Sequence, residues 1–152
     1  MKVKIKSSDG LKKLSQSAKA LKMEARAGVK AGSTNDETYK KVSDYGRMLE
    51  YGTAQMPARP FLRQTVAECK SNWNEQIKYG LKARGIDKAY QVLVGTASLM
   101  MKDIRATIRK GNFEPLARPT IEAKKQKGRP EPTAPLIDST SLIQSIGSEV
   151  RK

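Results

Sequence analysis

Residues 60–84 read PFLRQTVAECKSNWNEQIKYGLKAR, and this stretch decides most of the fold. Its apolar residues recur every three or four positions, the spacing that places side chains on one face of a helix. Pro60 suits the first position of a helix, because a proline lacks the amide hydrogen that would have no partner there. We therefore predict a helix over about 60–83 with a buried stripe, in which Cys69 is a small core residue. The stripe consists of Leu62, Val66, Cys69, Trp73, Ile77 and Leu81.

The same periodicity predicts a long helix on either side. One helix covers about 87–110, after an interruption at Gly85 and before an end at Gly111. Its stripe consists of Tyr90, Leu93, Ala97, Met100 or Met101, Ile104 and Ile108. The other helix covers about 11–30 and has lysines on its polar face. Its apolar positions are Leu14, Ala18, Leu21, Ala25 and Val29.

Strand signals are few. Residues 2–6 alternate between lysine and an apolar residue, which is typical of an edge strand. Residues 40–51 favour a partly helical element, with Val42, Tyr45, Leu49 and Met48 as its inward candidates. After a short helical turn, residues near 146–150 favour a last strand. We predict an α+β fold: a small, mostly antiparallel sheet of the first strand, the last strand and residues near 40–45, packed against two or three long helices.

The proline content rises after Gly111. Five of the seven prolines lie between Pro115 and Pro135, with a cluster of lysines at 124–127. This composition predicts an extended, solvent-facing arm with at most one short helix, at 120–127. A length of 152 residues favours a single domain. We expect its core within about 1–111, and the arm and terminal element within about 112–152.

Composition excludes several chemistries. The chain has no histidine and one cysteine, so no histidine-based nucleophile, histidine-ligated metal, internal disulfide or thiolate zinc site is available. No glycine-rich phosphate-binding motif occurs. Asp103, Glu122 and Lys124 have the residue types of a metal-dependent nuclease, but such a set arises by chance in most charged helical proteins. We predict no catalytic, cofactor-binding or metal-binding residue, and no enzymatic activity.

The net charge of +15 is concentrated at the amino terminus, where residues 1–30 carry nine basic and two acidic residues. The lysines of this region form either a solvated helix face or a contact for DNA or an acidic partner. The candidates are Lys12, Lys13, Lys19 and Lys22. No apolar run approaches the roughly 20 residues of a membrane span, so we expect a soluble protein made in the cytoplasm.

Two blocks of sequence carry a resemblance to a known family. Residues 45–63 read YGRMLEYGTAQMPARPFLR, a Glu and an aromatic-Gly-Thr turn followed by Pro-Ala-Arg-Pro-Phe-Leu. The second block contains Phe113-Glu114-Pro115-Leu116 and Pro135-Leu136-Ile137-Asp138. Both blocks resemble the head-tail joining proteins of long-tailed bacteriophages, which are also called neck, tail-completion or virion morphogenesis proteins. One departure is Thr140, which stands where the family usually has glycine, so we expect a locally different turn there.

The resemblance implies a structural virion protein at the neck or the top of the tail, made in the bacterial host. It implies a ring of identical subunits, six by family expectation, around the DNA channel, with other neck, connector or tail proteins and double-stranded DNA as partners. We expect a rigid corner, with Glu50 paired to Arg59 or Arg63, and with Phe61 either in the core or in a subunit contact. The corner residues are Glu50, Tyr51, Gly52, Arg59, Pro60, Phe61 and Arg63.

We also expect the arm to wrap an adjacent subunit. Its candidate contacts are Phe113, Pro115, Leu116, Pro135, Leu136 and Ile137. The sequence does not distinguish a neck adaptor from a tail-completion or tail-terminator protein. The alternative from another class is a small basic DNA-binding protein that uses its lysine-rich first helix.

Overall fold

The computed structural model describes residues 22–151, and the α+β prediction is confirmed for them. The predicted strand at 2–6 and most of the first predicted helix lie outside the described residues. The elements are β1 (Glu24–Val29), α2 (Val42–Tyr51), α3 (Phe61–Arg84), a 3-10 turn (Ile86–Lys88), α4 (Ala89–Lys110), α5 (Arg118–Gln126), α6 (Ser141–Ser145) and β2 (Ile146–Arg151).

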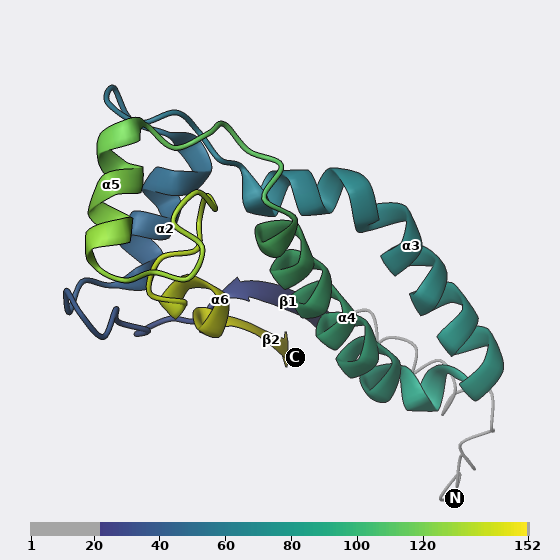
Figure 1. Cartoon of the computed structure of the whole chain (residues 1–152). Helices are drawn as coiled ribbons and strands as arrows, with labels where there is room; N and C mark the ends of the chain where they lie inside the picture. Colours follow the sequence, from purple (N-terminus) through teal and green to yellow (C-terminus); the bar gives the residue numbers. More distant parts are fainter. Residues whose placement is uncertain (1–21, 152) are drawn as a thin grey trace, which may run out of the picture.

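The two long helices α3 and α4 form an antiparallel pair that extends beyond the rest of the molecule (Figure 1). Their predicted bounds are confirmed to within two residues, and Gly85 and Gly111 follow their ends with positive φ angles. The helices approach closely at Gly80, where an added Cβ would lie 2.6 Å from a methyl carbon of Val92. Nearer the core, the hydroxyl of Thr65 donates a 2.8 Å hydrogen bond to the hydroxyl of Thr107.

The predicted apolar stripes are only partly correct. Trp73, Ile104 and Ile108 are buried as expected, but Val66 is 46% exposed and Tyr90 is 49% exposed. The reason is that, over much of their length, α3 packs mainly against α4 and no third element among residues 22–151 covers the pair. Only part of each apolar stripe is therefore buried, and the rest stays exposed to solvent. On α3 the fully buried residues Phe61 and Thr65 lie at the end that joins the core.

The prediction of a helix over 11–30 is wrong for residues 24–29, because they form strand β1. Ala25 and Val29 are four positions apart, and this spacing puts two side chains on one face of a helix and also of a strand. Ala27 lies between them and completes a strand face. Gly28 weakens a helix interior, and the antiparallel partner β2 supplies the hydrogen bonds that hold the strand.

Among residues 22–151 the sheet therefore has two antiparallel strands, from Glu24 opposite Arg151 to Val29 opposite Ile146. α4 packs against both strands (Figure 1), and this support matters because a two-stranded sheet is marginal by itself. The last strand and the helical turn before it are confirmed. The prediction that residues near 40–45 belong to the sheet is wrong, since α2 begins at Val42 and only Lys41 makes an isolated bridge, to Thr34.

One apolar cluster joins α2, α3, α4, α6 and β2. It consists of Val42, Phe61, Ile104, Ile108, Leu142 and Ile146, all at most 4% exposed. Tyr45 and Leu49 pack against it as predicted, whereas Met48 is 52% exposed. The core thus lies where one end of α4 meets the sheet and the shorter helices.

Candidate functional site

The corner between α2 and α3 is organised by the carboxylate of Glu50, which is 3% exposed. It accepts hydrogen bonds from the backbone N–H groups of Leu62 (2.9 Å) and Arg63 (3.0 Å), in the first turn of α3. The Nε of Arg63 donates a third hydrogen bond, at 3.1 Å. Pro60, at the N-cap position, makes no side-chain cap. Glu50 therefore caps α3 from another helix, where a negative charge also interacts favourably with the helix dipole.

The turn after Glu50 needs glycine. Gly52 has φ of +76°, and a Cβ there would lie 2.8 Å from the backbone nitrogen of Ala58. Tyr51 projects outward, 67% exposed, and the guanidinium of Arg63 lies 4.9 Å from the centre of its ring. The chain thus reverses tightly here and leaves an aromatic ring on the surface beside the capped helix.

Arg59 has a different partner from the one expected for it. Its guanidinium is not bonded to Glu50 but donates to the backbone oxygens of Glu114 (3.0 Å) and Pro115 (3.2 Å). Arg59 is 4% exposed, so these carbonyls satisfy a buried cation. The two blocks of the chain that carry the family resemblance are therefore bonded to each other.

Pro60 and Phe61 also had predicted roles at the corner. Pro60 precedes α3 by one residue instead of opening it. Phe61 is completely buried in the apolar cluster, so it is a core residue and not an exposed anchor for a neighbouring subunit. Of the two cationic partners considered for Glu50, the structure selects Arg63.

The proline-rich segment corrects the prediction of a free, solvent-facing arm, because it folds back onto its own chain. Phe113, Leu136 and Ile137 pack against the apolar cluster, and Pro135 is buried. Pro115 is exposed, and the predicted short helix is confirmed as α5. The physical reason is that this segment carries enough apolar side chains at its two ends to cover the core within one subunit.

Two basic side chains, Lys124 and Arg129, hold the folded-back segment. Lys124, on α5, is 6% exposed, and its ammonium donates to the backbone oxygens of Ala134 (2.8 Å) and Ile137. Arg129 donates from Nε to Asp138 (3.0 Å) and from Nη2 to Glu37, which joins the segment to the loop before α2.

These contacts, and the burial that accompanies them, shift the pKa values of Glu37, Arg129 and Lys124. The hydrogen bond from Arg129 is the main cause that lowers the pKa of Glu37, although desolvation opposes it. The same hydrogen bond raises the pKa of Arg129. Burial lowers the pKa of the Lys124 ammonium, because desolvation disfavours the charged form, and the nearby charge of Asp138 partly offsets this.

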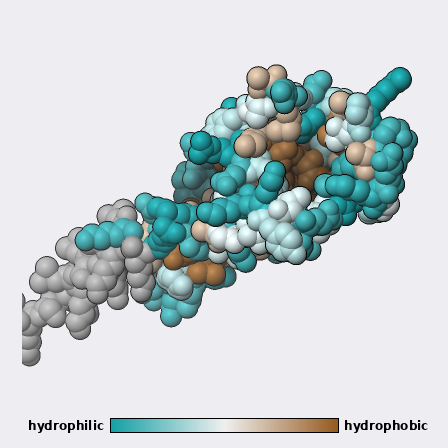
Figure 2. Space-filling view, turned by 90° about the vertical axis from the view of Figure 1, so that its left-hand side faces the viewer, coloured by the Kyte–Doolittle hydropathy of each residue, from teal (hydrophilic) through white to brown (hydrophobic). Residues whose placement is uncertain are grey.

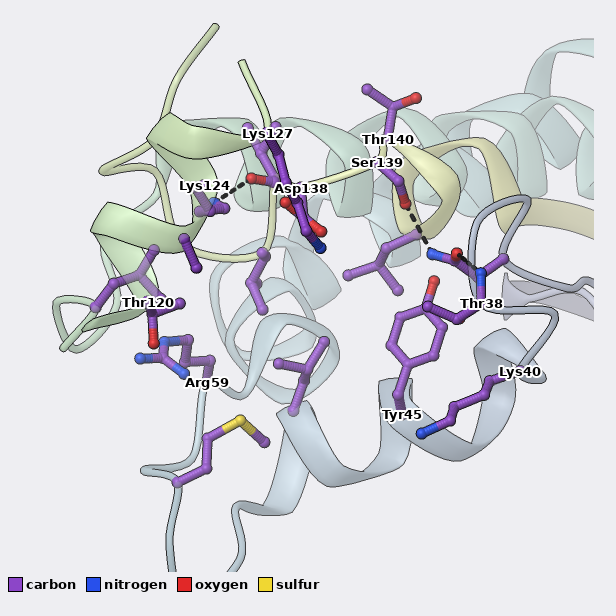
Figure 3. A pocket seen from close by; sticks show the side chains of 18 residues that line it. Thr38, Lys40, Tyr45, Arg59, Thr120, Lys124, Lys127, Asp138, Ser139 and Thr140 are labelled. Atoms are coloured by element: carbon purple, nitrogen blue, oxygen red, sulfur yellow. Dashed lines mark hydrogen bonds between the residues drawn. The ribbon is translucent and has the colours of Figure 1, made fainter. Parts of the chain in front are cut away.

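Between α2, α5 and the loop at 134–140 lies a pocket of about 420 Å³ (Figure 3). Arg59, Lys124 and Leu116, the last an expected arm contact, are among its lining residues. Figure 2, which views the face of the molecule that carries α2 and α5, shows an apolar hollow bordered by hydrophilic side chains.

Within residues 22–151, the structure does not bring the other sequence-predicted residues together. Lys12, Lys13 and Lys19 lie outside the described residues, and Lys22 is exposed in a turn before β1. The nuclease-like set is dispersed: Asp103 accepts a 2.7 Å hydrogen bond from the indole of Trp73, and Glu122 pairs with Lys125. Residues 22–151 contain no acidic or sulfur cluster suited to a metal and no helix long and apolar enough to cross a membrane.

Sequence reasoning missed the structural roles of Lys124 and Arg129. Lys124 stands in a run that reads as a solvated charged face, and nothing local distinguishes it from its neighbours Lys125 and Lys127. Arg129 lies outside the two blocks of the resemblance. Its partners Glu37 and Asp138 are 92 and 9 residues away along the chain, so no local pattern indicates its role. No protein-family model, curated protein or solved structure matches this chain.

Proposed function

We propose that this chain is a structural protein of a tailed bacteriophage, which assembles into a closed ring at the head-tail neck or the top of the tail. The observation that carries the proposal is the pair of hydrogen bonds from Arg59 to the carbonyls of Glu114 and Pro115. These residues belong to the two sequence blocks that resemble head-tail joining proteins. These hydrogen bonds join the two blocks in the folded chain. The blocks therefore have a structural reason to occur together in one sequence.

Exposed apolar residues support assembly with copies of the same chain. On α2, Met48 and Tyr51 are 52% and 67% exposed, and on the long helical pair Tyr79 and Val94 are 68% and 40% exposed. A head-to-tail ring requires two different surfaces on each subunit, one for each neighbour, and exposed apolar groups are typical of such contacts. We assign the α2 residues to one surface and the helical pair to the other.

The symmetry of the ring, its place in the virion and its partners are proposed from the resemblance to head-tail joining proteins. We propose a sixfold ring around the DNA channel of the virion, in contact with other neck, connector or tail proteins. The chain serves as an adaptor, tail-completion or tail-terminator protein, and it uses no catalytic residue. Its positive charge faces either the DNA of the channel or an acidic neighbouring ring.

Mixing two interface variants tests the ring. We expect the native protein to form rings by light scattering coupled to size exclusion and by electron microscopy. Tyr51→Asp and Tyr79→Asp each damage one surface and abolish rings. An equimolar mixture of the two variants yields a dimer, because each contributes one intact surface. Asn112→Asp is the matched control and retains rings, because Asn112 is exposed after α4, outside both assigned surfaces.

A native protein that stays monomeric at all concentrations contradicts the proposal. Tight binding of that monomer to duplex DNA, with an affinity that falls steeply as salt rises, would favour the alternative of a small basic DNA-binding protein. Electron microscopy of whole particles locates the ring and reports its symmetry.

A further inference from the structure

The pocket between α2 and α5 combines an apolar floor with an open mouth. Its floor is formed by leucine and isoleucine side chains that come from four different parts of the chain. They are Leu49, Leu116, Leu136, Ile137 and Leu142. Four of these are only half-buried, so apolar surface stays open to a ligand. A volume of about 420 Å³ lies within the range of small ligand pockets, roughly 300–1,000 Å³.

The walls of the pocket are cationic. Among the described residues that line it, four are basic and one, Asp138, is acidic, and that carboxylate already accepts a hydrogen bond from Arg129. Lys40 and Lys127 stand on different walls, the loop before α2 and the end of α5 (Figure 3). Both are exposed, and neither forms an ion pair within residues 22–151.

The buried cations of the pocket have no carboxylate from residues 22–151 bonded to them. Arg59 and Lys124 are each more than nine-tenths buried, and their hydrogen-bond partners within the described chain are backbone oxygens. An ammonium has three N–H donors, and two of those of Lys124 are used. A carboxylate brought near Lys124 would favour its charged form and offset the desolvation that lowers its pKa.

We propose that this pocket binds an acidic, apolar peptide segment of a partner protein. Large apolar side chains of the segment occupy the floor, and its carboxylates meet the lysines of the mouth. A second copy of this chain is the poorer occupant, because with 30 basic and 15 acidic residues it brings like charge to a cationic mouth. The inference goes beyond the proposed ring and does not rest on it.

Calorimetric titration of the full-length protein with defined peptides tests the proposal. The probe is acetyl-Ser-Asp-Leu-Glu-Phe-Asp-Leu-Glu-Ser-amide. One control peptide replaces its acids with Asn and Gln, and the other replaces Leu and Phe with Ala. We expect the probe to bind and both controls to bind at least about tenfold more weakly, since affinity then needs both apolar contact and charge.

Variants locate the binding. Lys40→Glu combined with Lys127→Glu reverses two exposed charges at the mouth, and Ala123→Trp fills the opening from the exposed surface of α5. We expect each to weaken probe binding by about tenfold or more. Lys78→Glu combined with Lys82→Glu is the matched control: it makes the same change of charge on exposed α3, away from the pocket, and changes affinity by less than about twofold. Circular dichroism checks that every variant is folded.

Several outcomes overturn the proposal. One is a native protein that does not bind the probe, and another is equal binding of the uncharged peptide. Full probe binding by Ala123→Trp would place the site elsewhere. If the α3 control lost as much affinity as the variant with reversed charges at the mouth, the binding would be a general attraction between opposite charges and not a property of the pocket. Self-association that Ala123→Trp abolishes would identify a second copy as the occupant. Rings that persist while probe binding fails would separate this inference from the proposed function.

Discussion

Replacing Glu50 with alanine tests the physical basis of the corner. The change removes a buried acceptor of two N–H groups in the first turn of α3. Loss of a helix cap costs about 1–2 kcal/mol, and loss of the favourable charge at the helix amino terminus about 0.3–1 kcal/mol. The side chain of Arg63 is 57% exposed, so its ion pair adds at most about 1 kcal/mol. We expect the free energy of unfolding to fall by about 2–3 kcal/mol.

The comparison with Arg63→Ala separates the cap from the ion pair. If the cap dominates, Arg63→Ala costs only about 0.5–1 kcal/mol, and the double variant is close to Glu50→Ala alone. Glu50→Gln keeps an acceptor oxygen and falls between the native protein and Glu50→Ala. Urea denaturation followed by circular dichroism measures each value. A loss below about 0.5 kcal/mol for Glu50→Ala, within the range of ordinary surface substitutions, would refute the cap.

Four further predictions concern single positions. Phe61→Ala empties a fully buried site and should lower the free energy of unfolding by about 3–5 kcal/mol in urea; a change under about 1 kcal/mol would contradict its place in the core. Gly52→Ala meets backbone atoms at a positive φ, so the thermal midpoint should fall, and an unchanged midpoint would argue against the turn. Thr140 has φ of +61°, and its hydroxyl accepts a 3.1 Å hydrogen bond from the side-chain amide of Gln144. Thr140→Gly should raise the free energy of unfolding by about 0.5–1 kcal/mol through relief of strain. A loss of stability would mean that the hydrogen bond with Gln144 outweighs the strain. Because the folded state lowers the pKa of Glu37 from 4.5, its contact with Arg129 stabilises the fold above that pH and is lost as the pH falls through the lowered value. Urea curves should therefore show a difference between native protein and Glu37→Gln at pH 7 that shrinks toward pH 3, and a constant difference would refute the linkage.

The turn at Thr140 shows where sequence reasoning was too strict. A non-glycine residue predicted a different turn, but Thr140 adopts the left-handed conformation itself at the start of α6. Packing of the residues that follow holds it there, since Ser141 and Leu142 are buried. Tertiary contacts thus outweigh a local cost of about 1–2 kcal/mol.

The candidate site was predictable in part. The pairing of Glu50 with a nearby arginine followed from their positions on either side of one turn. The contact of Arg59 with the carbonyls of Glu114 and Pro115 did not, because local sequence carries no signal for a bond between segments that far apart. The same holds for Lys124, whose burial depends on how α5 lies against the loop at 134–140.

The sequence by itself determined the long helices α3 and α4, the glycines that end them and the helical turn before the last strand. These features depend on periodicity and capping within a few residues of the chain. Only the tertiary structure decided that residues 24–29 form a strand, that the proline-rich segment folds back and that a cationic pocket lies beneath it. Each of these depends on partners far along the chain, and a local pattern compatible with both helix and strand takes the form that its distant partner stabilises.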